Sequence, residues 1–524
     1  MAVTYRIHPA IGIARIGDSP DDFFVGPEAP GVVPAPKKPG DASTHPATYK
    51  DSHHRIKRQG ARFRIYEYTE DAARGVTKVR EITATDAEIE WEVHLANRKA
   101  ASPTLQGGGR RNAGKPEADL IIDPGAHRIS GANHAMKKVR GTFMKTFEVQ
   151  LGDLLTDAAG RLIVLGGHGK SQSLPGSKLD DFADNDGWCD DAADGPVRAT
   201  LRLKGSAAPV TADPAWVIVA PPDFAPALGN VVSLYDAVYN MMAGFEPRLA
   251  VSDATPVSFT KDIYPLLQRV SNMHWVSKIA AKRHGEGKRM HFTSRVDELS
   301  SNKPEHAAAR MEVLKALRKP KGIPGAPGDG TMPKLPNLAV SEAPGAAITE
   351  VQYKRMERWA HGKFDADWPG AEPAATPLDR LPEQDRPRAL DRAALEACVG
   401  GPFFPGIEAS RVMLDAATYD ARRPFRINAN LPPGALTGRM AVPWQADFND
   451  CSIEQGADWW PGQRPNEVRR GREVHASWTP PEWNDGEPHR DMLEKWAQLG
   501  FVVPKTVAGK VEYVEDERSL VEPT

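Results

Sequence analysis

Apolar and polar residues alternate with a period of two in several short segments of the first 220 residues. In residues 89–95, four apolar side chains are separated by two glutamates and a histidine. Successive side chains of a strand point to opposite faces, so this alternation predicts a strand with one buried face. Similar patterns predict strands in residues 1–15, 63–68, 161–165, 199–203 and 216–220. The N-terminal half is therefore predicted to be an antiparallel β region.

The period of the apolar positions changes after about residue 256. Thr349 followed by Gln352 has the spacing of a capping pair, and apolar positions continue through Ala360 to a stop before Gly362. Shorter helices are predicted at residues 391–399 and 490–499, each followed by glycine.

Residues 319–347 are rich in proline and glycine and predict a long surface loop. Together the patterns predict an α+β protein. Its β-rich domain spans residues 1–256, and a mixed, loop-rich and helical domain spans residues 257–524.

Charge and composition narrow the class of protein. The 524 residues carry 67 Lys and Arg against 69 Asp and Glu, a net charge of -2. This balance gives no field to attract nucleic acid or an anionic membrane, and no apolar run reaches the roughly 18 residues that a membrane helix needs. We expect a soluble protein. Because no export signal is visible and three cysteines cannot form a disulfide framework, we expect it in the cytoplasm.

Two charged segments have ordinary interpretations. Residues 180–194 contain seven aspartates, but their spacing does not fit an EF-hand, so a solvated acidic loop is preferred to an irregular calcium site. The basic residues between Arg55 and Arg64 predict a charged strand face, with a site for a substrate carboxylate as the alternative. The 15 histidines form no zinc-protease motif, and no metal is predicted.

Tryptophan is concentrated near the C-terminus. Six of the 12 tryptophans lie in residues 444–496, together with Cys451. An aromatic core explains Trp496, which lies on a helical stripe, but the others stand in proline-broken backbone that often forms surfaces or sites. Asp447 precedes Cys451 by four residues, so one helical turn puts carboxylate and sulfur on the same face. A lone cysteine is more often a small buried hydrophobe, and residue chemistry alone leaves both interpretations open.

The segment from Leu436 to Cys451, followed by Trp459–Asn466, resembles the cofactor region of the lysine ε-oxidase/glycine oxidase family. The likeness extends over nearly the whole chain, through colinear blocks at residues 7–17, 55–64, 120–125, 185–196, 219–224 and 390–408. Members of this family carry cysteine tryptophylquinone, in which a cysteine sulfur is joined to a tryptophan that has become an ortho-quinone.

The resemblance implies roles for single residues. Cys451 corresponds to the cross-linked sulfur, and Trp478 stands where the family has its quinone tryptophan, with Trp459, Trp460 and Trp483 as alternatives. Asp447 is implied as the catalytic base and as a residue of cofactor maturation. Cys398, in a matched block, and His475, three residues before Trp478, are candidates for the substrate pocket.

The resemblance also implies an activity. We expect a homo-oligomeric quinoprotein oxidase that deaminates an amino acid or primary amine through a Schiff base, uses O₂, and releases ammonia and hydrogen peroxide. A flavoprotein partner is expected to assist formation of the thioether cross-link. The alternatives are a non-catalytic relative without mature cofactor, and a quinone dehydrogenase acting on a pathway intermediate.

Overall fold

The structure is a computed structural model. It describes residues 2–32, 48–71, 73, 75–105, 107–134, 136–206, 208–320, 323, 332–333, 347–401, 405–450, 462–471, 473–483 and 489–519.

One large sheet gathers the strands of the first 220 residues. Its 13 strands are β1 (Ala2–His8), β2 (Ile11–Arg15), β3 (Phe23–Val25), β4 (Arg58–Asp71), β5 (Gly75–Ile82), β6 (Ala87–Val93), β7 (His127–Ser130), β8 (Lys137–Phe143), β9 (Phe147–Thr156), β10 (Leu162–Leu165), β13 (Ala193–Leu203), β14 (Val210–Thr211) and β15 (Ala215–Ala220). The main path runs β7-β6-β13-β15-β2-β4-β10-β9-β8, while β1, β3 and β5 also pair with β4, and β14 pairs with β13.

The strand predictions are confirmed. The alternation at residues 89–95 corresponds to β6, whose apolar side chains are buried and whose glutamates are exposed or half-buried. Most pairs of the sheet are antiparallel, as predicted, but β15 pairs with β2 and β3 pairs with β4 in parallel. The single strand predicted at residues 1–15 is wrong, because the chain breaks at Pro9-Ala10 into β1 and β2.

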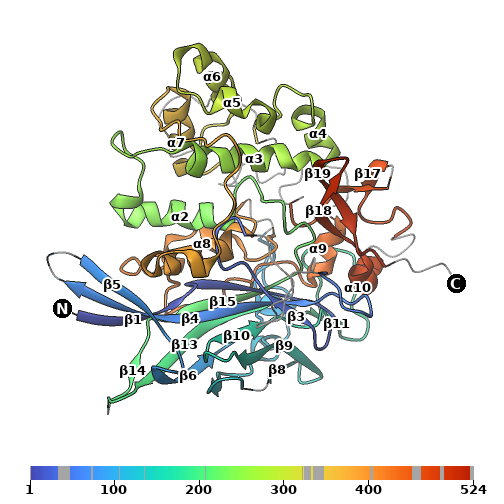
Figure 1. Cartoon of the computed structure of the whole chain (residues 1–524). Coiled ribbons are helices and arrows are strands. Elements are labelled where there is room, and N and C mark those ends of the chain that lie inside the picture. The colour runs from blue at the N-terminus through green and yellow to red at the C-terminus, as the bar shows by residue number, and fades with distance from the viewer. Residues whose placement is uncertain are drawn as a thin grey trace.

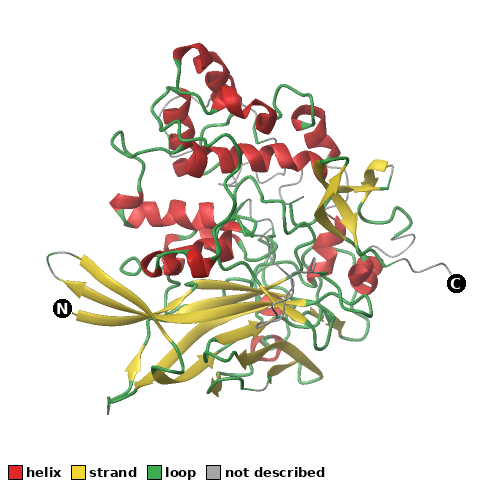
Figure 2. Ribbon diagram, in the orientation of Figure 1, coloured by secondary structure: helices red, strands yellow, loops and turns green. Residues whose placement is uncertain are grey.

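Helices dominate the later part of the chain and lie mostly on one side of the sheet (Figures 1 and 2). They are α1 (Glu117–Leu120), α2 (Leu234–Phe245), α3 (Tyr264–Asn272), α4 (Lys278–His284), α5 (Val296–Leu299), α6 (Ala307–Ala316), α7 (Glu350–Ala360), α8 (Arg386–Glu396), α9 (Trp444–Asp450) and α10 (Arg490–Lys495). A search of the described residues finds no helix with the length and apolar character that crossing a membrane requires.

The helix predictions are confirmed in part. Thr349 and Gln352 form a reciprocal capping box at the start of α7. Helix α8 begins at Arg386, five residues before the predicted start, since Pro387 fits the first turn, where no N–H is needed. Helix α10 is shorter than predicted, and a 3-10 turn follows it at Trp496–Gln498. The predicted loop at residues 319–347 lies largely outside the described residues.

The described residues also form three two-stranded sheets: β11 (Gln172–Ser173) with β12 (Trp188–Cys189), β16 (Glu467–Arg470) with β17 (Glu473–Ser477), and β18 (Phe501–Val507) with β19 (Lys510–Asp516). The sequence patterns predicted none of these three small sheets. In Figure 1, β17 to β19 form the red region beside α9 and α10. Val468 of β16 and Phe501 and Val502 of β18 join the core of the large sheet. A domain boundary near residue 256 stays a prediction.

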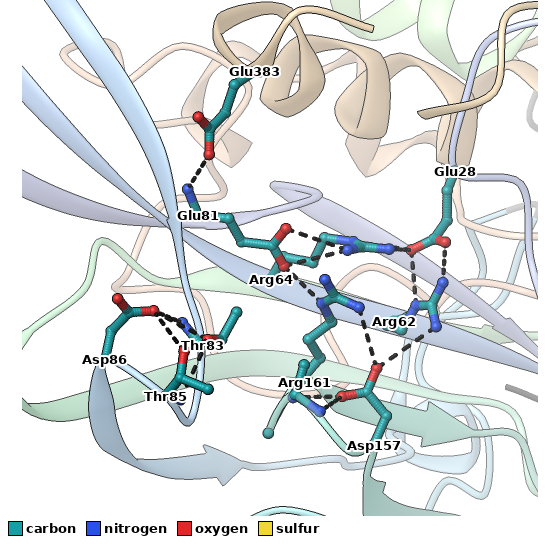
Figure 3. Close-up of polar contacts among 12 residues, drawn as sticks. Glu28, Arg62, Arg64, Glu81, Thr83, Thr85, Asp86, Asp157, Arg161 and Glu383 are labelled. Carbon is teal, nitrogen blue, oxygen red and sulfur yellow. Dashed lines mark hydrogen bonds and ion pairs between the residues drawn. The ribbon is translucent and has the colours of Figure 1, made fainter. Parts of the chain in front are cut away.

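Arg58, Arg62 and Arg64 of the basic run lie on β4, as the predicted charged strand face, but the alternative, a site for a substrate carboxylate, is wrong. Arg58 is fully buried against Asp153, and Glu28 pairs with both Arg62 and Arg64 (Figure 3). Glu81 and Asp157, with the further cation Arg161, extend this network of ion pairs across β4 and β5 (Figure 3). These guanidinium groups are neutralised within the protein, so they do not form a site for a substrate carboxylate.

The prediction of a solvated acidic loop is also wrong at its C-terminal end. Asp190, Asp191 and Asp194 are each at most 2% exposed. Their burial is compensated by a cation and by N–H groups of distant segments, which donate hydrogen bonds to these carboxylates, and the contacts position the candidate site.

Candidate functional site

Asp194 anchors the start of the segment that leads to Cys451. One carboxylate oxygen accepts hydrogen bonds from the Thr437 backbone N–H, at 2.8 Å, and from the Thr437 hydroxyl, at 2.7 Å. The other accepts from the Leu436 N–H and from the Trp216 indole. Burial raises the pKa of Asp194, and the four hydrogen bonds counteract that shift.

A buried ion pair holds the next part of this segment. The Lys99 ammonium donates to Asp190, at 2.8 Å, and to the Ala441 carbonyl, at 3.0 Å. The same Asp190 oxygen accepts from the backbone N–H of Trp444, the first residue of α9. The β region therefore determines where α9 begins.

Helix α9 carries Asp447 in its middle. Asp447 is 4% exposed. Gln445 fixes the helix from another direction, because its side chain accepts from the Ser171 hydroxyl and donates to the Gly169 carbonyl. The helix ends at Asp450. Cys451 is the next residue and lies outside the described part of the chain.

Trp478 follows β17 and is fully buried. Its indole N–H donates to the Gly500 carbonyl at 3.0 Å, and its backbone N–H donates to the Asn466 carbonyl. Phe224 packs against the ring with centroids 4.8 Å apart and planes inclined by 62°. These contacts fix the orientation of the indole.

Arg464 connects Trp478 with α9. Its guanidinium lies over the Trp478 ring, 5.0 Å from the centroid. Nε donates to the Phe448 carbonyl of α9 at 2.6 Å, while Nη2 donates to the Thr479 hydroxyl at 2.8 Å. Phe448 precedes Cys451 by three residues, which span at most about 10 Å. The structure thus brings the end of α9 and Trp478 to the same fully buried side chain.

The remaining tryptophans have different surroundings. Trp496 is buried, as predicted, and meets Trp444 edge to face with centroids 5.3 Å apart. Trp483 is partly buried at the edge of the core. Trp459 and Trp460 lie outside the described residues, so the structure does not compare them with Trp478.

Cys398 lies in a second buried polar cluster. Its sulfur is 3.6 Å from the guanidinium of Arg15, which also donates to Glu408 at 3.0 Å and lies 4.0 Å from Asp223. Burial and the Glu408 charge raise the pKa of the Cys398 thiol, so the thiol is neutral. Burial likewise raises the pKa of Asp223 to about 7, despite Arg15. The cluster therefore retains protons at neutral pH.

This cluster adjoins Trp478 through the backbone. Asp223 is followed by Phe224, which contacts the indole, and Gln463, which donates to Glu408, is followed by Arg464. The Phe224 N–H also donates to the Gln463 carbonyl at 2.8 Å.

His475 occupies different surroundings, on β17. It is half-buried, burial lowers its pKa, and the charged residues that affect it are Glu467 and Lys278. The contacts described for Trp478 do not include His475. Within the described residues no group of three or more His, Cys, Asp and Glu side chains is arranged to hold a metal ion.

Comparisons with known families identify the family of the chain. A family model described as L-lysine epsilon oxidase N-terminal matches residues 8–219. A second, described as L-lysine epsilon oxidase C-terminal domain, matches residues 330–478 and so ends at Trp478. The chain belongs to the L-lysine ε-oxidase family.

Relatives of the L-lysine ε-oxidase family have been characterised in Marinomonas mediterranea. The L-lysine 6-oxidase of that organism is 27% identical over 547 aligned residues, covering 86% of this chain and 71% of that protein. A crystal structure of its L-Lys epsilon-oxidase, at 23% identity, superposes with a TM-score of 0.76 over 98% of this chain and 95% of that one. A structure of the Schiff base intermediate of that enzyme with L-Lys matches equally well. These superpositions establish the fold and confirm the predicted α+β class.

Sequence reasoning missed several residues that build this candidate site. Arg15, Glu408 and Arg464 each lie inside a block that carried the family resemblance, so the blocks contained the signal. The blocks could not show that Arg15 pairs with Glu408, because these two residues are 393 positions apart in the sequence. Lys99 lay outside every block and had no signal.

Proposed function

We propose that this protein is a quinoprotein oxidase that deaminates an amino acid or primary amine, reduces O₂ to hydrogen peroxide and releases ammonia. Its cofactor is cysteine tryptophylquinone, formed from Cys451 and Trp478. The observation that carries the proposal is the pair of Arg464 hydrogen bonds, one to Phe448 of α9 and one to Thr479, in a chain of the L-lysine ε-oxidase family.

The described residues fit such a group. A buried indole, fixed by the Gly500 carbonyl and Phe224, provides a rigid ring shielded from water. Cys451 directly follows the helix that Arg464 joins to this ring. When formed, the quinone supplies an electrophilic carbonyl and accepts two electrons, which no unmodified side chain does.

Asp447 acts as the base in this proposal. Its carboxylate takes the proton from the carbon next to the amine nitrogen and holds it on an oxygen atom. The supporting observations are its burial and its position one helical turn before Cys451. The polar cluster of Cys398 is linked to the ring through Asp223 and the adjacent Phe224, which packs on the indole, so Cys398 is proposed to line the amine pocket, with His475 a more peripheral candidate.

The substrate class rests on the relatives. One is an L-lysine 6-oxidase, and one solved structure contains an intermediate with L-Lys. We propose an amino acid with a reactive primary amine, with L-lysine and glycine as the first compounds to test. A maturation flavoprotein and a homo-oligomeric state are parts of the same proposal.

The test is the mass of the peptides that contain Cys451 and Trp478, from protein produced with its maturation flavoprotein. A single cross-linked peptide that has gained two oxygens and lost four hydrogens supports the proposal. Two separate unmodified peptides contradict it and leave a non-catalytic relative. A cross-linked protein that releases ammonia from amines without forming peroxide is a dehydrogenase.

A further inference from the structure

We infer that Arg464 is a positioning residue for cofactor formation: it holds the end of α9 against Trp478, so that the thiol of Cys451 meets the indole. This inference rests on the proposed function. It assigns to Arg464 a role in making the cofactor, separate from any role in turnover.

The hydrogen bonds of Arg464 use its forked geometry. Nε donates to Phe448, Nη1 to the Pro465 carbonyl at 2.7 Å, and Nη2 to the Thr479 hydroxyl. A planar guanidinium has its donors at fixed angles, so binding three acceptors at once fixes the relative position of the segments that carry them. Two of these segments are α9 and the residue after Trp478.

The same guanidinium also covers a face of the indole. At 5.0 Å from the centroid, its positive charge is attracted to the ring electrons. Together with Phe224 and the bond from the indole N–H to Gly500, this contact leaves the ring one orientation. Ring and helix end are therefore aligned before any covalent chemistry takes place.

Alignment matters because the cross-link joins two groups with no strong intrinsic reactivity. The thioether replaces the S–H of Cys451 and one aromatic C–H of Trp478 by an S–C bond. Two protons and two electrons leave, and the electrons pass to an oxidant, either dioxygen or a flavin. Holding two reacting groups in place accelerates such steps by orders of magnitude, so a small misplacement is costly.

The experiment compares cross-linking in variants of the full chain produced with the flavoprotein. Arg464→Met removes all three hydrogen bonds, and Arg464→Lys keeps the charge without the fork. Thr479→Val removes only the acceptor beside Trp478 and keeps the side-chain shape. Arg518→Gln is the matched control, because Arg518 donates to the Trp478 carbonyl and pairs with Glu515 on β19.

The readouts are the cross-linked peptide fraction, the number of free thiols after denaturation and the melting temperature. We expect wild type and Arg518→Gln to be cross-linked with two free thiols of three cysteines. The cross-linked fraction of Arg464→Met should be about tenfold lower than that of wild type. The fractions of Arg464→Lys and Thr479→Val should lie between these two values. If Arg464→Met does not fold, the cross-linked fraction of the folded Thr479→Val and Arg464→Lys variants tests the inference.

Two results overturn the inference and are distinguishable. If wild type is cross-linked and folded Arg464 and Thr479 variants are cross-linked to the same extent, Arg464 does not position the thiol. If wild type itself has three free thiols and unmodified peptides, the proposed function fails, and the inference fails with it.

Discussion

Lys99 and Asp190 form an ion pair of 2.8 Å in which neither side chain is exposed. Lys99 also binds the backbone of Ala441, and Asp190 binds the backbone of Trp444. The pair therefore connects the N-terminal region to the start of α9. Removal of one member of a buried ion pair is costly, because the charge of the other member is then buried without compensation.

Lys99→Met is therefore expected to lower the free energy of unfolding by about 3–5 kcal/mol, because Asp190 is left buried without its cation. Urea denaturation measures this change. The double variant Lys99→Met/Asp190→Asn should recover a large part of the loss, since it leaves no uncompensated charge. Equal instability of the single and double variants would show that packing, not charge, explains the effect.

Trp478→Phe is expected to abolish the cross-link completely, because phenylalanine keeps an aromatic ring at this buried position but has no indole. Trp483→Phe is the matched control, since Trp483 is partly buried at the edge of the core. It should retain the cross-linked peptide and the visible absorbance of the cofactor. A cross-linked Trp478→Phe protein would transfer the assignment to another tryptophan.

Asp447→Asn keeps the shape of a buried side chain and removes its charge. We expect it to lower kcat by about a hundredfold or more, since the proton acceptor is lost, or to leave the cofactor immature. Peptide mass separates the two outcomes, because only the second has unmodified Cys451 and Trp478. Full activity of Asp447→Asn or Asp447→Ala would remove Asp447 from the mechanism.

Asp191 makes stability depend on pH. Burial and the neighbouring Asp190 raise its pKa to about 7 in the folded protein, although Gly169 and Lys170 N–H groups bind the carboxylate. In the unfolded chain the carboxyl ionises near pH 4, at its ordinary pKa. Between these values the folded state binds one more proton, so this group's contribution to stability decreases as pH rises from about 4 to 7.

Asp191→Asn should therefore have a smaller decrease in melting temperature between pH 5 and pH 8 than wild type. Its gain over wild type should appear at the higher pH. Thermal denaturation at both pH values measures this difference, and parallel pH profiles of the two proteins would contradict it.

Local patterns predicted the elements that depend on local structure. The alternation in β6 and the Thr349–Gln352 pair of α7 are complete within a few residues. The short α10 is different. Gly500, predicted to cap this helix, is needed for another reason, because a Cβ atom there would lie 2.6 Å from the Asp516 carbonyl oxygen of β19.

The candidate site rests on the family resemblance, which implied Asp447, Cys451 and Trp478, and these roles stay predictions. Composition and spacing could not indicate that Asp190 is buried, because its compensating cation, Lys99, lies 91 residues earlier. For the same reason the acidic segment was misinterpreted as solvated. A partner that lies far away in the sequence cannot be recognised from local patterns, although it is what compensates the buried charge.

The long-range partners of the β region have a consequence for the order of synthesis. The strands of the large sheet are complete by residue 220, but the partners of two buried charges are synthesised later. Asp194 is bound by Thr437, and Arg15 pairs with Glu408. A nascent chain that ends before Glu408 leaves both buried charges without these partners, which disfavours a closed native core. The strands of the large sheet are therefore expected to stay accessible to proteases until residues 408–437 have been synthesised.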